Sequence, residues 1–452
     1  MRAWIVRRIL RLFRTLSRIS LWFETRFTAV GRLIIGGAVA AAVFGVDPRQ
    51  TLAFQLAAVL IALIIVAMLA SLRWRPRLEC KRNLPDTVTV GTAISYSISI
   101  TNHGNTVQGG LVLADRLLTR YPTPKNFLDA KAGLRQNDLN WFDRRVGFPR
   151  WLDLVRRSRG ARLLPVPVPT IAAHSTVKVT IALTPLRRGK LIFTDLEVKR
   201  PDPLGIFFAK HRVRLHGDLV SLPKRYPVPP LHWISERHFH RGGLTLAATV
   251  GDSEEFVGLR DYRPGDPLRH IHWRSFAKRG TPVVKEYQDE YFDRHALIID
   301  TYAGGGPPNY FEAAISVAAS FIQTPRPSDS ILDLVFIEQQ VWQLTTGRGL
   351  SNNHQILTQL AELQPTGADE FEHLAAYLRR YLDRLASIIM VTPTWDPVRQ
   401  AFVDELHRRR MRCLVLRINE AAPDNEDAAA VTGRIVRPSL LERDIANIAV
   451  PV

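Results

Sequence analysis

The feature that most constrains this chain is an uncharged apolar run of 22 residues, from Thr51 to Leu72. A helix rises about 1.5 Å per residue, so a run of this length can cross a hydrocarbon core of roughly 30 Å. A buried helix of a soluble core is the alternative, but the run lacks any polar side. The run therefore predicts a transmembrane helix.

A second apolar stretch, Leu33 to Val46, precedes this run and is rich in glycine and alanine. The residues between the two, Asp47 to Gln50, are typical of a tight turn. Small residues let helices approach closely in a bilayer, so we expect residues 31–72 to form a hairpin of two transmembrane helices. Basic residues are dense on both sides of the hairpin, whereas its loop holds only Arg49. Positive residues stay inside, which predicts that both termini are cytoplasmic.

Residues 1–30 precede the hairpin and carry apolar side chains at helical spacing, from Trp4 to Ile19, with arginines between them. This pattern predicts a basic amphipathic helix that lies on the surface of a membrane with anionic headgroups. A cleaved signal peptide is the alternative, but the basic head is too long and no small-residue cleavage site follows promptly.

The formal net charge of +19 indicates attraction to lipid headgroups, nucleic acid or an acidic protein surface. Nucleic acid is the weaker alternative, because much of the charge adjoins the predicted hairpin and aromatic residues suited to base stacking are not interleaved with it. The two cysteines, Cys80 and Cys413, belong to no CxxC or Cys/His cluster. A zinc site and a disulfide framework are therefore not expected.

Residues 78–235 are predicted to form a β-sandwich domain. Polar and apolar residues alternate from Thr87 to Asn102 and again from Ser175 to Leu183, and turn residues follow each block. Short alternating strands of this kind are typical of a sandwich. The segment near 119–168 has weak periodicity and is rich in Arg, Asp, Trp and Pro. We expect it to be an insertion in a sandwich loop.

Residues 293–452 alternate between strand-like and helical apolar patterns. The expected strands are 295–300, 331–337, 385–392 and 413–418, and the expected helices are 310–322, 354–363, 371–382 and 397–410. This alternation predicts an α/β doubly wound, largely parallel sheet. Binding crevices of such sheets lie at the carboxyl ends of the strands, where we expect Asp300 and the loop from Thr392 to Asp396.

The segment 236–292 links these two domains and contains the most distinctive motif, from Glu254 to Glu286. Its fixed positions follow the pattern EF-x-x-L-R-x-Y-x-x-G-D, then R-x-I-x-W, a basic residue with glycine, and V-K-E. This motif resembles the signature of the DUF58 family (domain of unknown function 58), as do the turn at Arg187–Gly189 and the run Asp202–Gly205. The candidate partner-binding residues are Arg260, Asp261, Tyr262, Gly265, Asp266, Arg269, His270, Trp273 and Lys278.

The family resemblance implies a membrane hairpin, an immunoglobulin-like β domain and a von Willebrand factor A-like α/β domain, in a protein of the bacterial inner membrane. It also implies association with AAA+ ATPases of the MoxR type, in envelope stress or the assembly of complexes. Domains of the von Willebrand A type often bind Mg²⁺ through D-x-S-x-S. The equivalent run here, Asp300 to Gly304, lacks both serines, so we expect a degenerate ion site at Asp300 and no metal or cofactor.

Two interpretations of the motif remain. In one, Arg260, Asp261, Asp266 and Arg269 pair internally; in the other, the basic residues form a docking surface for an acidic partner. We expect the Trp273 side chain to be buried where the two domains meet, because large aromatic side chains are usually buried.

A non-enzymatic membrane-anchored adaptor is the function that these patterns favour. The chain has no P-loop, GxSxG, HExxH or Rossmann glycine motif. An enzyme remains the alternative, since Glu254, Glu255, His270 and His272 could form an acid/base cluster, although no nucleophile accompanies them. A basic nucleic-acid-binding membrane protein is the third possibility.

Overall fold

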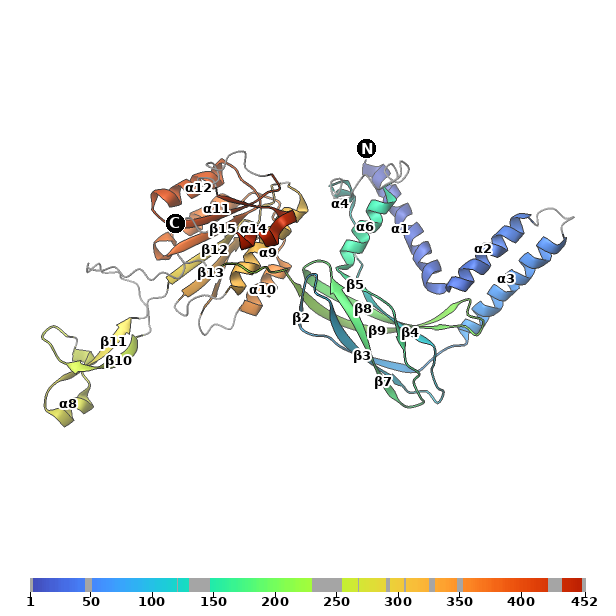
Figure 1. Ribbon diagram of the computed structural model, residues 1–452, viewed down its shortest axis with the longest axis horizontal. Helices are drawn as coiled ribbons and strands as arrows, with labels where there is room; N and C mark the ends of the chain where they lie inside the picture. The colour runs from blue at the N-terminus through green and yellow to red at the C-terminus, as the bar shows by residue number, and fades with distance from the viewer. Residues whose placement is uncertain are drawn as a thin grey trace. The chain divides into compact units, whose positions relative to one another are not determined.

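The computed structural model describes residues 3–44, 51–119, 121–129, 147–229, 254–266, 268–289, 293–304, 306–324, 330–347, 353–421 and 433–448. It divides the chain into two compact units, each considered by itself below. The first comprises Met1–Lys224 with Thr358–Glu362, and the second comprises Arg225–Leu357 with Leu363–Val452. Together they make a multi-domain chain of mixed α/β structure (Figure 1).

Three helices begin the first unit: α1 (Ala3–Arg26), α2 (Ala29–Phe44) and α3 (Thr51–Leu72). Helices α2 and α3 pack side by side (Figure 1). Small residues such as Ala38 and Ala57 are buried, whereas larger apolar side chains such as Leu33 and Leu52 are exposed. Among the described residues, the stretch Leu52–Leu72 of α3 is long and apolar enough to cross a bilayer, and the apolar stretch Ala29–Val43 of α2 is shorter. The predicted turn at residues 47–50 lies outside the described residues.

A tight loop fastens the start of α2 to the β domain. The Asp202 carboxylate accepts hydrogen bonds from the backbone N–H groups of Leu204, Ile206 and Phe207, at 2.6 to 2.8 Å. The folded loop presents the Ile206 carbonyl, which accepts a hydrogen bond of 3.1 Å from the Thr28 N–H. A Cβ atom added to Gly31 would lie 2.1 Å from the same carbonyl oxygen. This loop, Asp202–Phe207, therefore holds the start of α2 on the β domain, and we call it the clasp.

Two sheets form the β domain. The first has the order β1-β3-β7-β5, with β1 (Leu78–Asn83), β3 (Ile94–Asn102), β5 (Ala161–Leu163) and β7 (Thr176–Pro185). The second has the order β2-β9-β8-β4-β6, with β2 (Thr87–Thr89), β4 (Leu111–Leu117), β6 (Val166–Val168), β8 (Gly189–Pro201) and β9 (Phe208–Leu222). Ile98 and Ile181 of one sheet and Phe193 and Val198 of the other belong to one buried core cluster, because each strand turns alternate side chains inward.

The interruption expected near 119–168 is shorter than predicted. It contains the helices α4 (Pro124–Asp129) and α6 (Phe148–Arg159), but residues from Ala161 onward already pair within the two sheets as β5 and β6. Strands of three residues give too little alternation to be recognised in a sequence. Residues 130–146 lie outside the described residues.

The second unit contains a six-stranded sheet of order β14-β13-β12-β15-β16-β17. Its strands are β12 (Asp293–Ile299), β13 (Ser330–Ile337), β14 (Val341–Thr346), β15 (Ser387–Thr392), β16 (Arg412–Ile418) and β17 (Arg434–Val436). All neighbours are parallel except β13 and β14. The predicted largely parallel sheet is thus confirmed. The strands β14 and β17 were not expected, since β14 follows a tight turn and β17 has only three residues.

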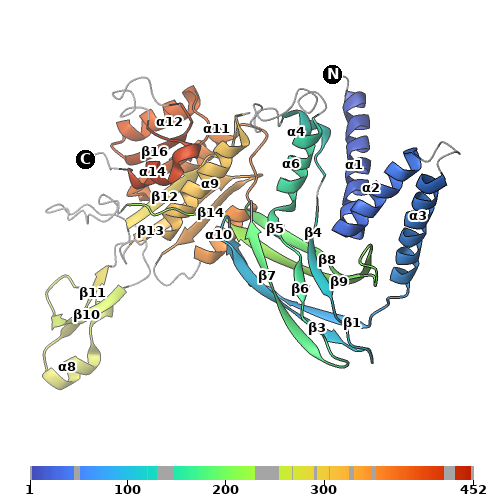
Figure 2. The same cartoon turned by 45° about the vertical axis from the view of Figure 1, so that its right-hand side comes forward.

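Helices cover both faces of this sheet (Figure 2). They are α9 (Pro308–Gln323), α11 (Phe371–Arg379), α12 (Pro397–Arg408) and α14 (Leu441–Ala446), with 3-10 turns η4 (Leu382–Arg384) and η5 (Pro438–Leu440). The residues of α10 (Asn353–Glu362) are divided between the two units. Helices α11 and α12 bury Phe371 and Phe402 against Ala296 and Met390 of the central strands. The carboxyl ends of β12 and β15 therefore meet the first turn of α12.

The signature motif forms a small hairpin of its own. Strands β10 (Glu254–Asp261) and β11 (Val283–Asp289) are antiparallel, and between them lie η3 (Leu268–His270) and α8 (Trp273–Arg279). We call residues 254–289 the signature hairpin. The register of its strands shifts between Phe256 and Gly258, which is typical of a β-bulge.

Candidate functional site

An ion pair fixes the turn of the signature hairpin. Two guanidinium nitrogens of Arg260 donate to the two carboxylate oxygens of Asp266, each at 2.7 Å, and Asp266 also accepts a bond of 2.9 Å from the Arg263 N–H. These bonds, first those from Arg260, lower the pKa of Asp266 to about 2. Gly265 has a φ of 108°, a conformation that favours glycine. The turn is therefore pre-ordered, and the expected pairing of Arg260 with Asp266 is present.

The other predicted residues occupy the same turn. The Asp261 carbonyl accepts a bond of 3.2 Å from Arg260, and the Tyr262 N–H donates to the Pro282 carbonyl at 3.0 Å. The Arg269 guanidinium donates to His270 at 3.2 Å. The expected pairing of Asp261 and Arg269 with opposite charges is not among the contacts of the described residues.

Trp273 departs from the prediction. Its side chain is 63% exposed, so the expectation of a buried position was wrong. The short helix α8 packs on β11 through its inner side, while Trp273 begins the helix and contacts Phe276 edge-to-face at 6.1 Å. Leu268 of η3 is also exposed. The hairpin thus presents a large aromatic and an aliphatic side chain to solvent.

Basic residues are frequent near these apolar side chains in the sequence. Residues 258–285 contain seven arginines and lysines but two aspartates, one of which is the partner of Arg260. Arg269, Arg274 and Lys278 are exposed. Apolar anchors within a ring of charge are typical of a protein-binding surface.

The alternative acid/base cluster comprises Glu254, Glu255, His270 and His272, and the structure describes the side chains of the two histidines. His272 lies 2.7 Å from the Ser275 hydroxyl, at the start of α8. The side chains of Glu254 and Glu255 lie outside the described residues.

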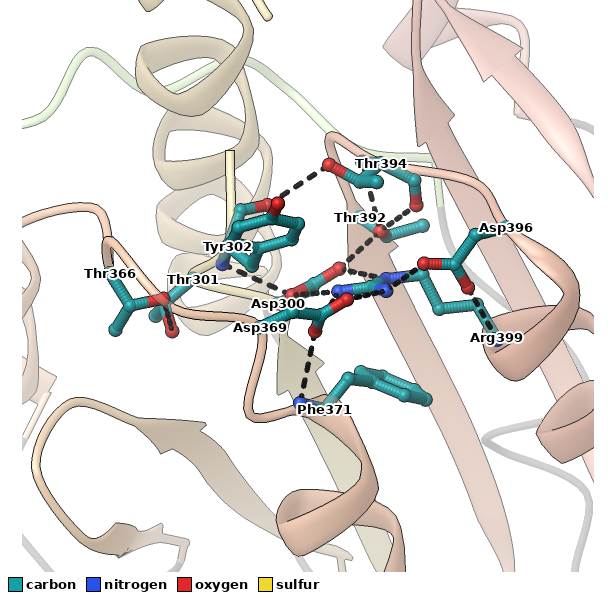
Figure 3. Close-up of polar contacts among 10 residues, drawn as sticks. All are labelled: Asp300, Thr301, Tyr302, Thr366, Asp369, Phe371, Thr392, Thr394, Asp396 and Arg399. Atoms are coloured by element: carbon teal, nitrogen blue, oxygen red, sulfur yellow. Dashed lines mark hydrogen bonds and ion pairs between the residues drawn. The ribbon is translucent and has the colours of Figure 1, made fainter. Parts of the chain in front are cut away.

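A second group of charged side chains lies at the carboxyl ends of β12 and β15 in the second unit (Figure 3). We call Asp300, Asp369, Asp396 and Arg399 the Arg399 cluster. Asp300 follows β12, Asp369 precedes α11, and Asp396 caps α12 by accepting a bond of 2.9 Å from the Arg399 N–H. The side chain of Arg399, in the first turn of α12, then points back to the carboxyl ends of the strands.

The guanidinium of Arg399 joins all three carboxylates. It donates to Asp300 at 2.6 and 3.1 Å, to Asp369 at 3.0 Å through two nitrogens, and to Asp396. Asp300 also accepts a bond of 2.6 Å from the Thr392 hydroxyl. The aromatic ring of Phe371 lies 4.7 Å from the guanidinium carbon. The Arg399 guanidinium therefore lies among the three carboxylates of the cluster.

Both Arg399 and Asp300 are buried. Burial raises the pKa of Asp300, and the hydrogen bonds from Arg399 oppose the rise. For Arg399, burial lowers the pKa, but the bonds to Asp300 and Asp369 raise it overall. The carboxylate that was expected to be the remnant of an ion site is the main partner of a buried arginine. Asp369 was missed because it lies in a loop without periodicity.

Some solved structures resemble parts of the chain. The ASH/PapD-like domain 7 of human CEP192 is 18% identical, covers 32% of this chain and 86% of its own, and has a TM-score of 0.19. Proximal thread matrix protein 1 from the mussel byssus, with a zinc occupied MIDAS motif, is 8% identical, covers 34% of this chain and 45% of its own, and has a TM-score of 0.26. Scores this low support no conclusion about this chain.

Sequence comparison is more informative. The uncharacterized protein YeaD of Bacillus subtilis (strain 168) is 23% identical over 180 residues, which are 39% of this chain and 42% of YeaD. The chain thus matches about two fifths of the length of that relative. Residues 258–432 match the model of the family described as protein of unknown function DUF58. The match runs from the signature hairpin through β16, so this part of the chain carries a DUF58 region.

Proposed function

We propose that this chain is a non-enzymatic, membrane-anchored adaptor that binds an acidic partner protein through its signature hairpin. The observation that carries the proposal is the exposure of Trp273 at the start of α8, in a hairpin whose turn is pre-ordered by the Arg260–Asp266 pair. Tryptophan and arginine are the residues most often responsible for affinity at interfaces. An ordered turn also reduces the entropy that is lost when a partner binds.

The anchor in this proposal is the pair α2 and α3, which both cross the inner membrane of a bacterial cell. The apolar exposed sides of the two helices and their close packing support this arrangement. Basic residues on both flanks favour cytoplasmic termini. The β domain would then be immunoglobulin-like and the second unit von Willebrand A-like, as the family resemblance implies.

The partner that we propose is an AAA+ ATPase of the MoxR type, acting in complex assembly or envelope stress. The excess of basic residues over residues 258–285 of the hairpin favours an acidic surface on the partner, because opposite potentials speed association and orient the partner. The contact would need no divalent ion, since the Arg399 guanidinium already lies among the three carboxylates that could hold one.

Capture of the ATPase by the full-length chain in detergent tests this proposal. The MoxR-type ATPase of the same organism is held in a nucleotide-trapped state, and its affinity is measured for wild type and Trp273→Ala. Loss of an interface hot spot costs about 2 kcal/mol or more, so the affinity should fall by roughly 30-fold. High salt should weaken binding further.

Trp342 provides the matched control, because this tryptophan of β14 is also exposed, at 42%. Trp342→Ala should retain the ATPase with nearly unchanged affinity. The proposal fails if wild type retains no ATPase, or if the two tryptophan variants lose affinity equally.

A further inference from the structure

A pocket lies between α1 and the two helices inserted in the β domain, all within the first unit. Its volume is about 370 Å³, and its wall is formed by Arg7, Leu10, Arg11, Arg14, Tyr121, Pro122, Pro124 and Trp151. Figure 1 shows α1 beside α4 and α6. A volume of this size is sufficient for a small ligand.

Helix α1 presents three different faces along its length, because successive side chains turn by about 100°. The face that packs on the β domain carries the buried residues Leu10, Phe13 and Ser17. A second face carries the exposed apolar residues Leu12, Leu16, Ile19 and Phe23. The third face carries Arg7, Arg11, Arg14 and Arg18. An ordinary amphipathic helix has two faces, so the third needs its own explanation.

Aromatic contacts hold the pocket wall in place. Phe13 contacts Phe148 at 5.2 Å, Trp151 at 6.2 Å and Phe127 at 6.4 Å, between ring centres. Trp151 is 1% exposed, and Tyr121 stacks on it at 6.0 Å. The Arg14 guanidinium lies 4.5 Å from the centre of the Tyr121 ring. Arg14 therefore faces a wall of packed aromatic rings.

The charge of the pocket is strongly positive. Arg7, Arg11 and Arg14 line it from one helix face, and no carboxylate occurs among the residues of its wall. Guanidinium groups bind the oxygens of phosphate in a bidentate manner, which makes a phosphate group the anion best suited to this set. The adjoining apolar face of α1 would lie in the membrane interface, and this places the arginines at the depth of the headgroups.

We propose that this pocket binds the phosphate of an anionic phospholipid headgroup. The inference rests on the proposed membrane anchoring but not on the proposed partner. The aromatic wall would contact the apolar part of the headgroup region, while Arg7, Arg11 and Arg14 contact the phosphate. Bound lipid would fix α1 against the β domain, because the ligand touches both sides of the pocket.

The test measures lipid binding by the full-length chain in neutral detergent, by native mass spectrometry. The probes are dioctanoyl phosphatidylglycerol, dioctanoyl phosphatidylcholine and inorganic phosphate. Wild type should retain phosphatidylglycerol in preference to the other two. In the double variant Arg11→Gln/Arg14→Gln, its affinity should fall by about tenfold or more, since two charged hydrogen-bonding partners are lost.

The double variant Arg8→Gln/Arg18→Gln is the control, because it removes two arginines of the same helix that do not line the pocket. It should keep its affinity within about twofold, as expected for exposed charges outside a site. Equal losses in the two double variants would show general attraction to a basic helix and would overturn the proposal. Equal binding of phosphatidylcholine, or binding of inorganic phosphate as strong as that of the lipid, would overturn it as well.

Two further measurements separate this inference from the proposed function. Both double variants should remain folded, as judged by their melting temperatures, and should float with vesicles through α2 and α3. They should also capture the ATPase like wild type. If the pocket variant loses lipid binding but still captures the ATPase, the result concerns the pocket alone. If the variants fail to float with vesicles, the proposed membrane anchor is refuted.

Discussion

Replacing Arg399 by methionine should destabilise the second unit strongly. The variant Arg399→Met keeps an unbranched stem over Phe371 but removes five hydrogen bonds to Asp300, Asp369 and Asp396. Asp300 is only 2% exposed, so its carboxylate would remain buried without its cation. Breaking a buried ion pair in this way costs about 3–5 kcal/mol.

Hydrogen exchange read by mass spectrometry measures this loss within the full-length chain. Peptides from β12 and β15 end at the cluster, and their amides should exchange roughly 10²- to 10⁴-fold faster in the variant, as the lost free energy implies. Arg408→Met is the control, because Arg408 is exposed on the same helix and donates to the carbonyl of Asp404 at 3.3 Å. It should change the exchange rates little.

The effect should also depend on pH in a defined direction. Without the guanidinium, the pKa of Asp300 in the folded state rises further above its unfolded value, because burial is no longer opposed by Arg399. The folded state then holds a proton that the unfolded state has released, so stability falls as the pH rises through this interval. The ratio of variant to wild-type exchange rates should therefore be larger at pH 8 than at pH 5.5. A ratio below about threefold at pH 8 would refute the reasoning.

Two other predictions concern the first unit and the thiols. Gly31→Ala should lower the melting temperature of the full-length chain in detergent, because the new methyl group would overlap the Ile206 carbonyl; Gly36→Ala on the same helix meets nothing within 4 Å and should not. Burial raises the pKa of Cys80 to about 11 and that of Cys413 to about 12, so neither thiol should react with Ellman's reagent at pH 8 until denaturant is added. Rapid modification of the native chain, or equal effects of the two glycine variants, would contradict these expectations.

The sequence allowed the second unit to be predicted well, because its strands are long and apolar. The runs at 295–300 and 385–392 lie in the centre of a parallel sheet and carry the pattern of strands that are buried on both faces. The edge strand β14 was missed because its partly buried, half-polar residues form no continuous apolar run, and β17 was missed because it has only three residues. The same holds for β5 and β6.

The candidate sites were only partly predictable. Asp300 and Asp396 were placed at the crevice from topology, but the role of Arg399 was not foreseen, because an arginine in a helical pattern looks like a solvated side chain. Its position after the Asp396 cap, within the first turn of α12, was the available signal. The exposure of Trp273 could not be foreseen either, since it depends on how little of the chain packs on the short helix α8.

The clasp at Asp202 has a mechanical consequence. The helices α2 and α3 join the β domain through the peptide chain after Leu72 and, independently, through the contact of Thr28 with the loop at Ile206. With a single attachment, the β domain could rotate relative to α2 and α3 about one bond. Two attachments at different strands of the domain oppose this rotation. A tilt of these helices would thus be transmitted as torque to β8 and β9, the strands that flank the loop.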